Sequence, residues 1–183
     1  MKGIAVFCGS RLGATEAYKE GAIKLGKVMA DQGITLIYGG SSVGLMGALA
    51  DTVLENGGDA IGVIPQTLVE KEVAHHSLTD LHIVNTMHER KAKMAELADA
   101  FITMPGGAGT MEEFFEVYTW AQIGIHDKPF GLYNVNQYYT PLISLFDHMV
   151  NQEFLSQENR DMVMIDKDAE ALLQKFSSFK DKH

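Results

Sequence analysis

A glycine-rich run that ends in two carboxylates, Pro-Gly-Gly-Ala-Gly-Thr-Met-Glu-Glu at 105–113, offers the clearest chemistry in this chain. It follows an apolar stretch typical of a strand (100–104) and precedes an apolar stretch typical of a helix (114–123). In such a turn backbone N–H groups can close on an anion, and the helix N-terminus adds partial positive charge. The run therefore predicts a phosphate-binding loop. Because carboxylates repel phosphate, we expect the two glutamates to serve the part of the ligand beyond it.

The spacing of these glutamates supports two interpretations. Thr110 followed three residues later by Glu113 fits a capping box, in which both side chains satisfy free backbone N–H groups. A catalytic carboxylate one turn from a phosphate loop fits equally well. Glu112 and Glu113 lie about 100° apart around a helix, so we do not expect both to serve one atom. Glu113 lies nearer the loop if Thr110 faces the ligand.

A second polar cluster, Met-His-Glu-Arg-Lys-Ala-Lys-Met at 87–94, follows the fourth expected strand. Arg90 and Lys91 fall in the first turns of the expected helix, where cations oppose the helix dipole. A solvated charged face is the ordinary explanation for such a run. The position of Arg90 at the binding end of the sheet favours a functional role instead.

Short apolar runs alternate with longer amphipathic stretches, which indicates an α/β chain with a parallel sheet. We predict one Rossmann-like domain over 1–183, a doubly wound parallel sheet with helices on both faces. The expected strands are 3–8, 35–38, 60–64, 81–85, 100–104, 130–133 and 162–165. The expected helices are 15–32, 45–56, 87–98, 111–124, 141–151 and 168–176.

Glycine-rich turns follow three of these strands, at 9–13, 39–47 and 105–109. Ligands in such folds bind beyond the carboxyl ends of the strands, so the three turns predict one wall of a nucleotide-sized cleft. None of them has the G-x-G-x-x-G spacing, and no acidic residue closes the second strand to hold a ribose hydroxyl. The sequence therefore does not predict NAD.

The amino-acid composition disfavours several classes of protein. The formal net charge of −9 disfavours binding to a nucleic-acid backbone, although a local N–H nest can still hold a small anion. A single cysteine, Cys8, permits no internal disulfide and suits a reducing compartment. No apolar run is long enough for a signal peptide or a membrane span, so we expect a cytoplasmic protein. The seven histidines lack metal-ligand spacing, so we expect no metal.

Four segments together resemble the LOG (Lonely Guy) family of cytokinin riboside 5′-monophosphate phosphoribohydrolases. They are the run 105–113, the stretch 87–91, the loop 39–47 and the opening Phe-Cys-Gly-Ser at 7–10. The resemblance extends from Ile4 to about Phe176, and the pairing of P-G-G-x-G-T-x-E-E with an upstream R-K is specific. The family more often has an aromatic residue where Ala108 stands, which alters the expected pocket wall but not the loop.

The resemblance implies a site and a reaction. Arg90 and Glu113 would be the catalytic pair. Substrate contacts would come from Glu72, Arg90, Lys91, Gly107, Ala108, Gly109, Thr110, Met111, Glu112, Glu113 and Thr119. The enzyme would hydrolyse the N-glycosidic bond of a purine riboside 5′-monophosphate to an adenine-type base and ribose 5-phosphate, without a metal or cofactor. Family members have often been labelled lysine decarboxylases, but no lysine here is marked out for a Schiff base.

Two alternative functions stay open. One is an AMP nucleosidase-type salvage enzyme, and the other is a non-catalytic nucleotide or molybdenum-cofactor carrier of similar fold. The resemblance also implies a homodimer with the pocket near or across the interface. The stretch 111–125 adds to this expectation, because a helix that is apolar over much of its circumference is either deeply buried or shared with a partner.

Overall fold

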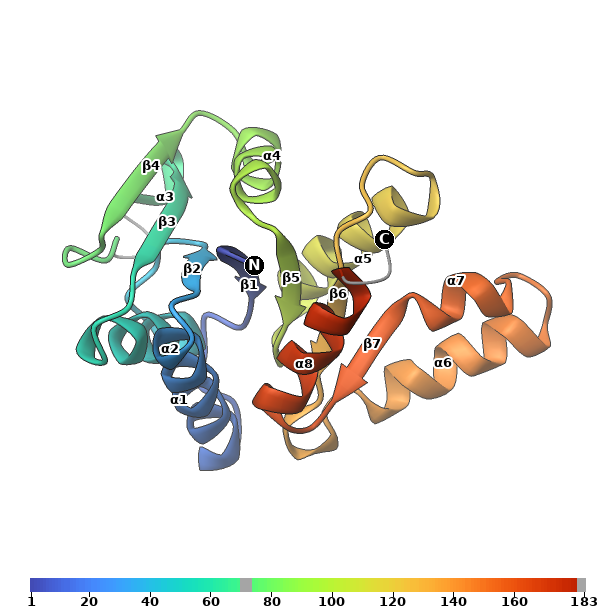
Figure 1. Cartoon of the computed structure of the whole chain (residues 1–183). Coiled ribbons are helices and arrows are strands. Elements are labelled where there is room, and N and C mark those ends of the chain that lie inside the picture. Colours follow the sequence, from blue (N-terminus) through green and yellow to red (C-terminus); the bar gives the residue numbers. More distant parts are fainter. Residues whose placement is uncertain (70–73, 181–183) are drawn as a thin grey trace.

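A seven-stranded sheet runs through the molecule in the computed structural model, which describes residues 1–69 and 74–180 (Figure 1). All strand pairs are parallel, and the order is β4-β3-β2-β1-β5-β6-β7. The strands are β1 (Gly3–Phe7), β2 (Thr35–Tyr38), β3 (Ala60–Pro65), β4 (Asp80–Val84), β5 (Ala100–Thr103), β6 (Phe130–Tyr133) and β7 (Val163–Asp166).

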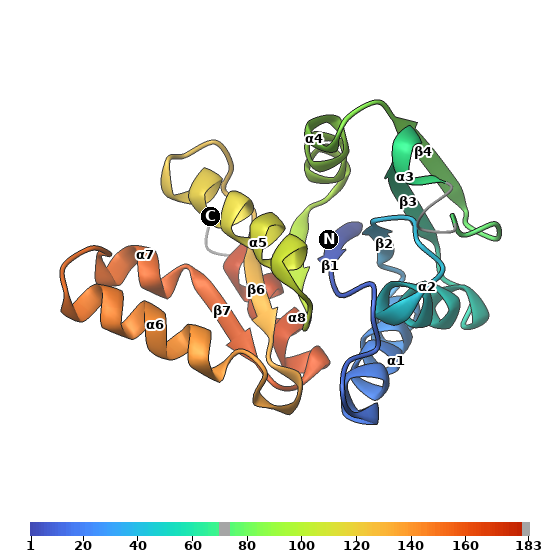
Figure 2. The same ribbon diagram turned by 180° about the vertical axis from the view of Figure 1, so that it is seen from behind.

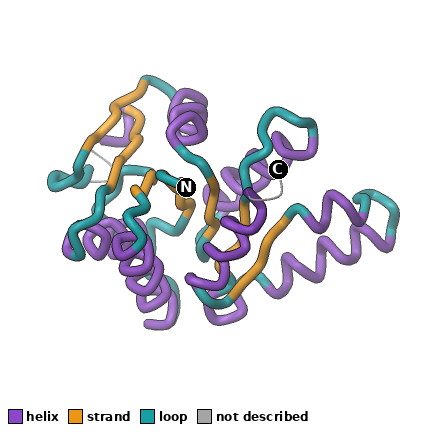
Figure 3. The backbone as a smooth tube through the Cα atoms, viewed as in Figure 1, coloured by secondary structure: helices purple, strands orange, loops and turns teal. Residues whose placement is uncertain are grey.

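Helices cover both faces of this sheet (Figures 2 and 3). They are α1 (Glu16–Asp31), α2 (Gly44–Glu55), α3 (Gln66–Val69), α4 (Met87–Leu97), α5 (Ala108–Gln122), α6 (Thr140–Asn151), α7 (Gln157–Asp161) and α8 (Ala169–Lys180), with a 3-10 turn η1 (Val135–Gln137). One core cluster lies beneath α1, α2 and α8, and a second beneath α4, α5 and α6. The predicted doubly wound α/β fold is confirmed.

The strands and long helices lie where the sequence predicted them, and the differences are local. The helices α3 and α7 were not expected because a segment of four or five residues carries no helical periodicity. Helix α7 is fixed instead by a cap, since Ser156 Oγ accepts from Asn159 N at 3.1 Å. Helix α5 begins three residues earlier than expected, at Ala108.

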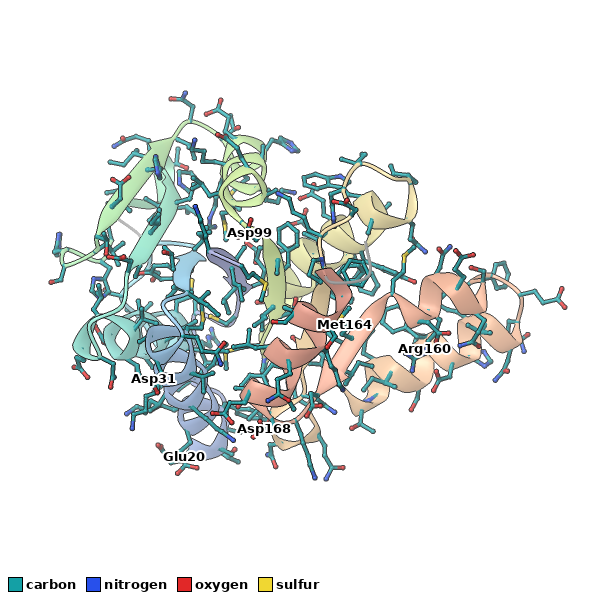
Figure 4. All side chains as sticks on the ribbon, in the orientation of Figure 1. Glu20, Asp31, Asp99, Arg160, Met164 and Asp168 are labelled. Carbon is teal, nitrogen blue, oxygen red and sulfur yellow. The ribbon has the colours of Figure 1, made fainter. Side chains whose placement is uncertain are left out.

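Side-chain contacts join both distant and neighbouring helices of the chain. Lys24 of α1 pairs with Asp168, which Figure 4 labels at the start of α8. Arg160 Nε of α7 donates to Asp147 Oδ1 of α6 at 2.8 Å, and the two helices run together as an arm beyond β7 (Figures 1 and 4). Among helices of the described residues, none is long and apolar enough to cross a membrane.

The strand order determines where along the sheet a ligand crevice can form. Strand β1 pairs with β2 on one side and with β5 on the other, so the strand order reverses beside it. A doubly wound sheet opens a crevice at the carboxyl ends of the strands where this reversal occurs. The loops after β1, β2 and β5 are the three glycine-rich turns, so the fold brings them to this crevice.

Candidate active site

A cavity of about 380 Å³ occupies the crevice. Its walls come from the end of β1 with the following loop, the end of β2, the start of α4 and the start of α5. The lining includes Phe7, Cys8, Gly9, Ser10, Gly39, Met46, Met87, Arg90, Met94, Gly107, Ala108, Gly109, Thr110, Glu112 and Glu113. The predicted meeting of three glycine-rich turns at one cleft therefore holds.

The N-terminus of α5 opens into this cavity. Its N-cap is Gly107, which has no side chain to bond the free N–H groups of the first turn. The first helical bond runs from Met111 N to Gly107 O at 3.1 Å. Three backbone donors, at Ala108, Gly109 and Thr110, therefore precede the helical ladder and can receive an anion.

This helix start removes the capping-box interpretation of Glu113. A capping box there needs Thr110 as the N-cap, but Thr110 is the third residue of the helix and Glu113 the sixth. The sequence suggested the wrong start because Gly-Ala-Gly is typical of a loop, whereas the backbone is already helical from Ala108. Glu113 is thus a second-turn residue that lines the cavity, and its position calls for a different explanation from capping.

The carbonyl groups of the glycine-rich turn are bonded to other parts of the protein. Tyr139 Oη donates to Met104 O and Tyr138 Oη donates to Gly106 O, both at 2.6 Å. Between them, Gly9 N donates to Pro105 O at 3.0 Å. With three successive carbonyls occupied, the turn presents N–H groups to a ligand in the cavity. Sequence reasoning missed both tyrosines, because nothing local to 138–139 signals contact with a loop more than 30 residues away.

Arg90 is buried at the cavity wall with 6% of its surface exposed. Its Nε donates to Val63 O at 3.0 Å and its Nη2 to Gly39 O at 3.1 Å, at the ends of β3 and β2. Its Nη1 lies 3.8 Å from Met87 Sδ, one turn earlier on α4. We call these three contacts the Arg90 clamp. The two carbonyl acceptors are neutral, so they fix the guanidinium without cancelling its charge.

The first turn of α4 that carries Arg90 is itself capped. Thr86 Oγ1 accepts from Glu89 N at 3.1 Å, and Glu89 Oε2 accepts from Asn85 N at 2.8 Å. This reciprocal pair resembles a capping box, and the T-x-x-E spacing at 86–89 was its available sequence signal. The cap fixes where α4 begins and hence where Arg90 enters the cavity.

Glu113 shares the cavity lining with Cys8, the residue that follows β1. Burial raises the pKa of Cys8 far above its usual range, and the charge of Glu113 raises that pKa further. The thiol is therefore neutral. Cys8 is therefore not a candidate nucleophile in the cavity.

Lys91 is used differently from its neighbour Arg90. Its Nζ binds Glu112 Oε1 at 2.6 Å and Glu116 Oε1 at 3.0 Å, which ties α4 to α5. Burial acts to lower the pKa of Lys91, but the hydrogen bonds to both glutamates outweigh burial and raise it. We call these three residues the α4–α5 bridge. Lys91 is not among the residues that line the cavity, whereas Glu112 belongs to the bridge and also lines the cavity.

The other residues implied by the resemblance divide into two groups. Arg90, Gly107, Ala108, Gly109, Thr110, Glu112 and Glu113 come together at the cavity. Met111 and Thr119 do not line it, and Thr119 is exposed about 14 Å along α5 from Thr110. Glu72 lies outside the described residues. Within those residues, no cluster of three or more His, Cys, Asp or Glu side chains could hold a metal ion.

Comparison with known sequences gives a consistent set of relatives. The family described as "Possible lysine decarboxylase" matches residues 46–176. The cytokinin riboside 5′-monophosphate phosphoribohydrolase of Rhodococcoides fascians is 47% identical over 173 residues, 94% of this chain and 87% of the relative. The enzyme of the same name, LOG1, from Arabidopsis thaliana is 45% identical over 182 residues, 100% of this chain and 85% of the relative.

Comparison with solved structures shows the fold. The molybdenum cofactor binding protein from Rippkaea orientalis superposes with a TM-score of 0.70 at 21% identity, covering 97% of each chain. The Moco carrier protein from Chlamydomonas reinhardtii gives a TM-score of 0.71 at 19% identity, covering 100% of this chain and 99% of the carrier. At these identities the likeness extends to the Rossmann-like architecture alone.

Proposed function

This chain belongs to the LOG family, and from that premise we propose that it hydrolyses purine riboside 5′-monophosphates, cytokinin nucleotides among them. The reaction breaks the bond between C1′ of ribose 5-phosphate and N9 of an adenine-type base. The oxygen of water ends on C1′, and the base leaves with a proton. The decarboxylase label has no counterpart in the site, since no lysine lines the described cavity to form a Schiff base.

One observation carries the proposal: an uncapped helix N-terminus, a carboxylate and a buried arginine share one cavity. The phosphate would accept hydrogen bonds from the first turn of α5. Glu113, one turn further along, would then face the ribose. A non-catalytic carrier needs the phosphate contacts but not a carboxylate and an arginine placed beside the sugar.

The chemistry follows from where charge develops. Loss of the base builds positive charge on the sugar ring, as in glycoside hydrolysis. The Glu113 carboxylate stabilises that charge and orients or deprotonates the attacking water. Arg90 serves in one of two ways: it supports the negative charge of Glu113, or it stabilises negative charge on the departing base. Neither step requires a metal or a cofactor.

The direct test uses the purified protein with AMP and with isopentenyl-AMP, and chromatography to detect released base and ribose 5-phosphate. We expect release from both nucleotides, and the two kcat/KM values show which base the pocket prefers. Adenosine should react far more slowly, because the phosphate contacts supply binding energy that is used at C1′. Tight nucleotide binding without any released base would contradict the proposal and favour a carrier.

We also propose a cytoplasmic homodimer with the pocket near the interface. The single cysteine, buried Cys8, suits the reducing cytoplasm. On α5 the half-buried Phe115 and Trp120, and just after it the exposed Ile123, offer apolar area to a second copy. The exposed Thr119 could reach a nucleotide only across such an interface. Light scattering at micromolar concentration should give about twice the 20.1 kDa chain mass, and a monomer that hydrolyses AMP would contradict this.

A further inference from the structure

The backbone conformation at position 39 does not explain why this residue is a glycine. It follows β2, next to Gly40, which has a φ of 77° and so adopts a conformation that favours glycine. The φ of Gly39 lies outside that left-handed region. Any residue could adopt its backbone conformation, so the explanation must lie in the space where a side chain would be.

That space is filled by Arg90. A Cβ on residue 39 would overlap Arg90 Nη2, and it would lie 3.0 Å from Met46 Sδ and 3.2 Å from Arg90 Cζ. The carbonyl of the same residue accepts from Nη2 at 3.1 Å. Gly39 therefore provides both an acceptor for the guanidinium and the room that the guanidinium occupies.

We propose that Gly39 is a positioning residue for the reaction, because the space left by its missing side chain sets where the Arg90 guanidinium lies. This inference rests on the proposed function. Gly39 itself touches no reacting atom in the mechanism above. It acts through the Arg90 clamp, so its substitution moves a charge within the cavity rather than removing one.

The clamp explains why catalysis would suffer more than folding. The atom that a new methyl group displaces is the far end of a long side chain, so the main chain does not have to move. A shifted Nη2, however, loses its hydrogen bond to Gly39 O. The movement of the guanidinium also strains the hydrogen bond from Nε to Val63 O. A misplacement of about 1 Å at a catalytic group can cost roughly 100-fold in rate.

The test is a double-mutant cycle between Gly39→Ala and Arg90→Lys, with kcat and KM measured on AMP. Lysine has no Nη2, so it removes the atom that the new methyl group would displace. We expect Gly39→Ala to lower kcat by roughly 10- to 100-fold in the wild-type background. In the Arg90→Lys background, the same substitution should change kcat by less than about twofold.

A matched control separates positioning from simple crowding. A Cβ at Gly58, after α2, would meet Val53 Cγ1 at 2.9 Å and Ala30 Cβ at 3.0 Å, away from the cavity. Gly58→Ala should lower the melting temperature and leave kcat unchanged. Gly39→Ala should instead lower kcat and leave the melting temperature close to that of the wild type.

Each outcome of the double-mutant cycle either supports or overturns the inference. Unchanged kcat in Gly39→Ala, or an equal loss with Arg90 and with Lys at position 90, would overturn the inference. If Gly39→Ala alone fails to fold, recovery of folding in Gly39→Ala/Arg90→Lys supports it, and continued unfolding overturns it. A wild-type protein that releases no base would instead contradict the proposed function, a result distinct from the failure of this inference.

Discussion

The two walls of the cavity both depend on glycine, but for different physical reasons. On the α5 wall, a Cβ at Gly107 or Gly109 would meet no protein atom within 4 Å, so the protein itself does not require glycine there. On the opposite wall, a Cβ at Gly39 would collide with Arg90. The first wall is open toward a ligand, and the second is fitted to a side chain of the protein. We infer that glycine serves ligand binding on one wall and the placing of Arg90 on the other.

The largest effect should come from the carboxylate between the walls. Glu113→Gln keeps the shape of the side chain and loses its charge, so we expect AMP hydrolysis to fall roughly 100- to 10,000-fold with the melting temperature unchanged. Glu20→Gln, on the exposed face of α1, is the matched control and should behave as wild type. A loss of stability with turnover retained would show that Glu113 is structural.

The next largest effect should come from the arginine held on the fitted wall. Arg90→Ala should lower kcat by roughly 100-fold or more, and Arg90→Lys should recover only part of this. A lysine has one nitrogen and cannot bond Val63 O and Gly39 O with the planar fork that now spans them. Steady-state kinetics on AMP measure both variants. Normal kinetics in Arg90→Lys would show that a point charge is enough.

Substitution on the open wall should act through the ligand alone. Gly109→Val should raise KM for AMP by roughly 10- to 100-fold because the new side chain enters the space expected for the phosphate. Its melting temperature should fall little, since a Cβ at this position would meet no atom of the described residues within 4 Å. Gly106→Ala is the contrasting variant, because its Cβ would overlap Thr110 Oγ1 and should cost stability first. A destabilised Gly109→Val with unchanged KM would remove the phosphate contacts from the mechanism.

The sequence predicted the open wall better than the fitted one. The open wall is encoded locally, because a strand, a glycine-rich turn and a helix follow one another between Ala100 and Gln122. The fitted wall joins Gly39, Val63 and Arg90 from three separate elements, and no spacing in the chain reports that contact. The start of α5 was misplaced for a related reason, since Gly109 suggested a loop at a position where the helix has already begun.

The smallest effect should come from a substitution in the α4–α5 bridge that joins the two walls. It tests most directly whether the two walls depend on each other. In Lys91→Met the side chain keeps its length but no longer separates Glu112 from Glu116, which then repel each other four residues apart. We expect kcat on AMP to fall by no more than about tenfold while KM stays unchanged, because the lysine holds the walls in register and does not line the cavity. The double variant Lys91→Met/Glu116→Gln should recover part of the loss by removing one of the repelling charges. The family resemblance implies that Lys91 contacts the substrate. A marked rise in KM for AMP, with adenosine unaffected, would show that this contact is to the phosphate and that the bridge breaks when substrate binds.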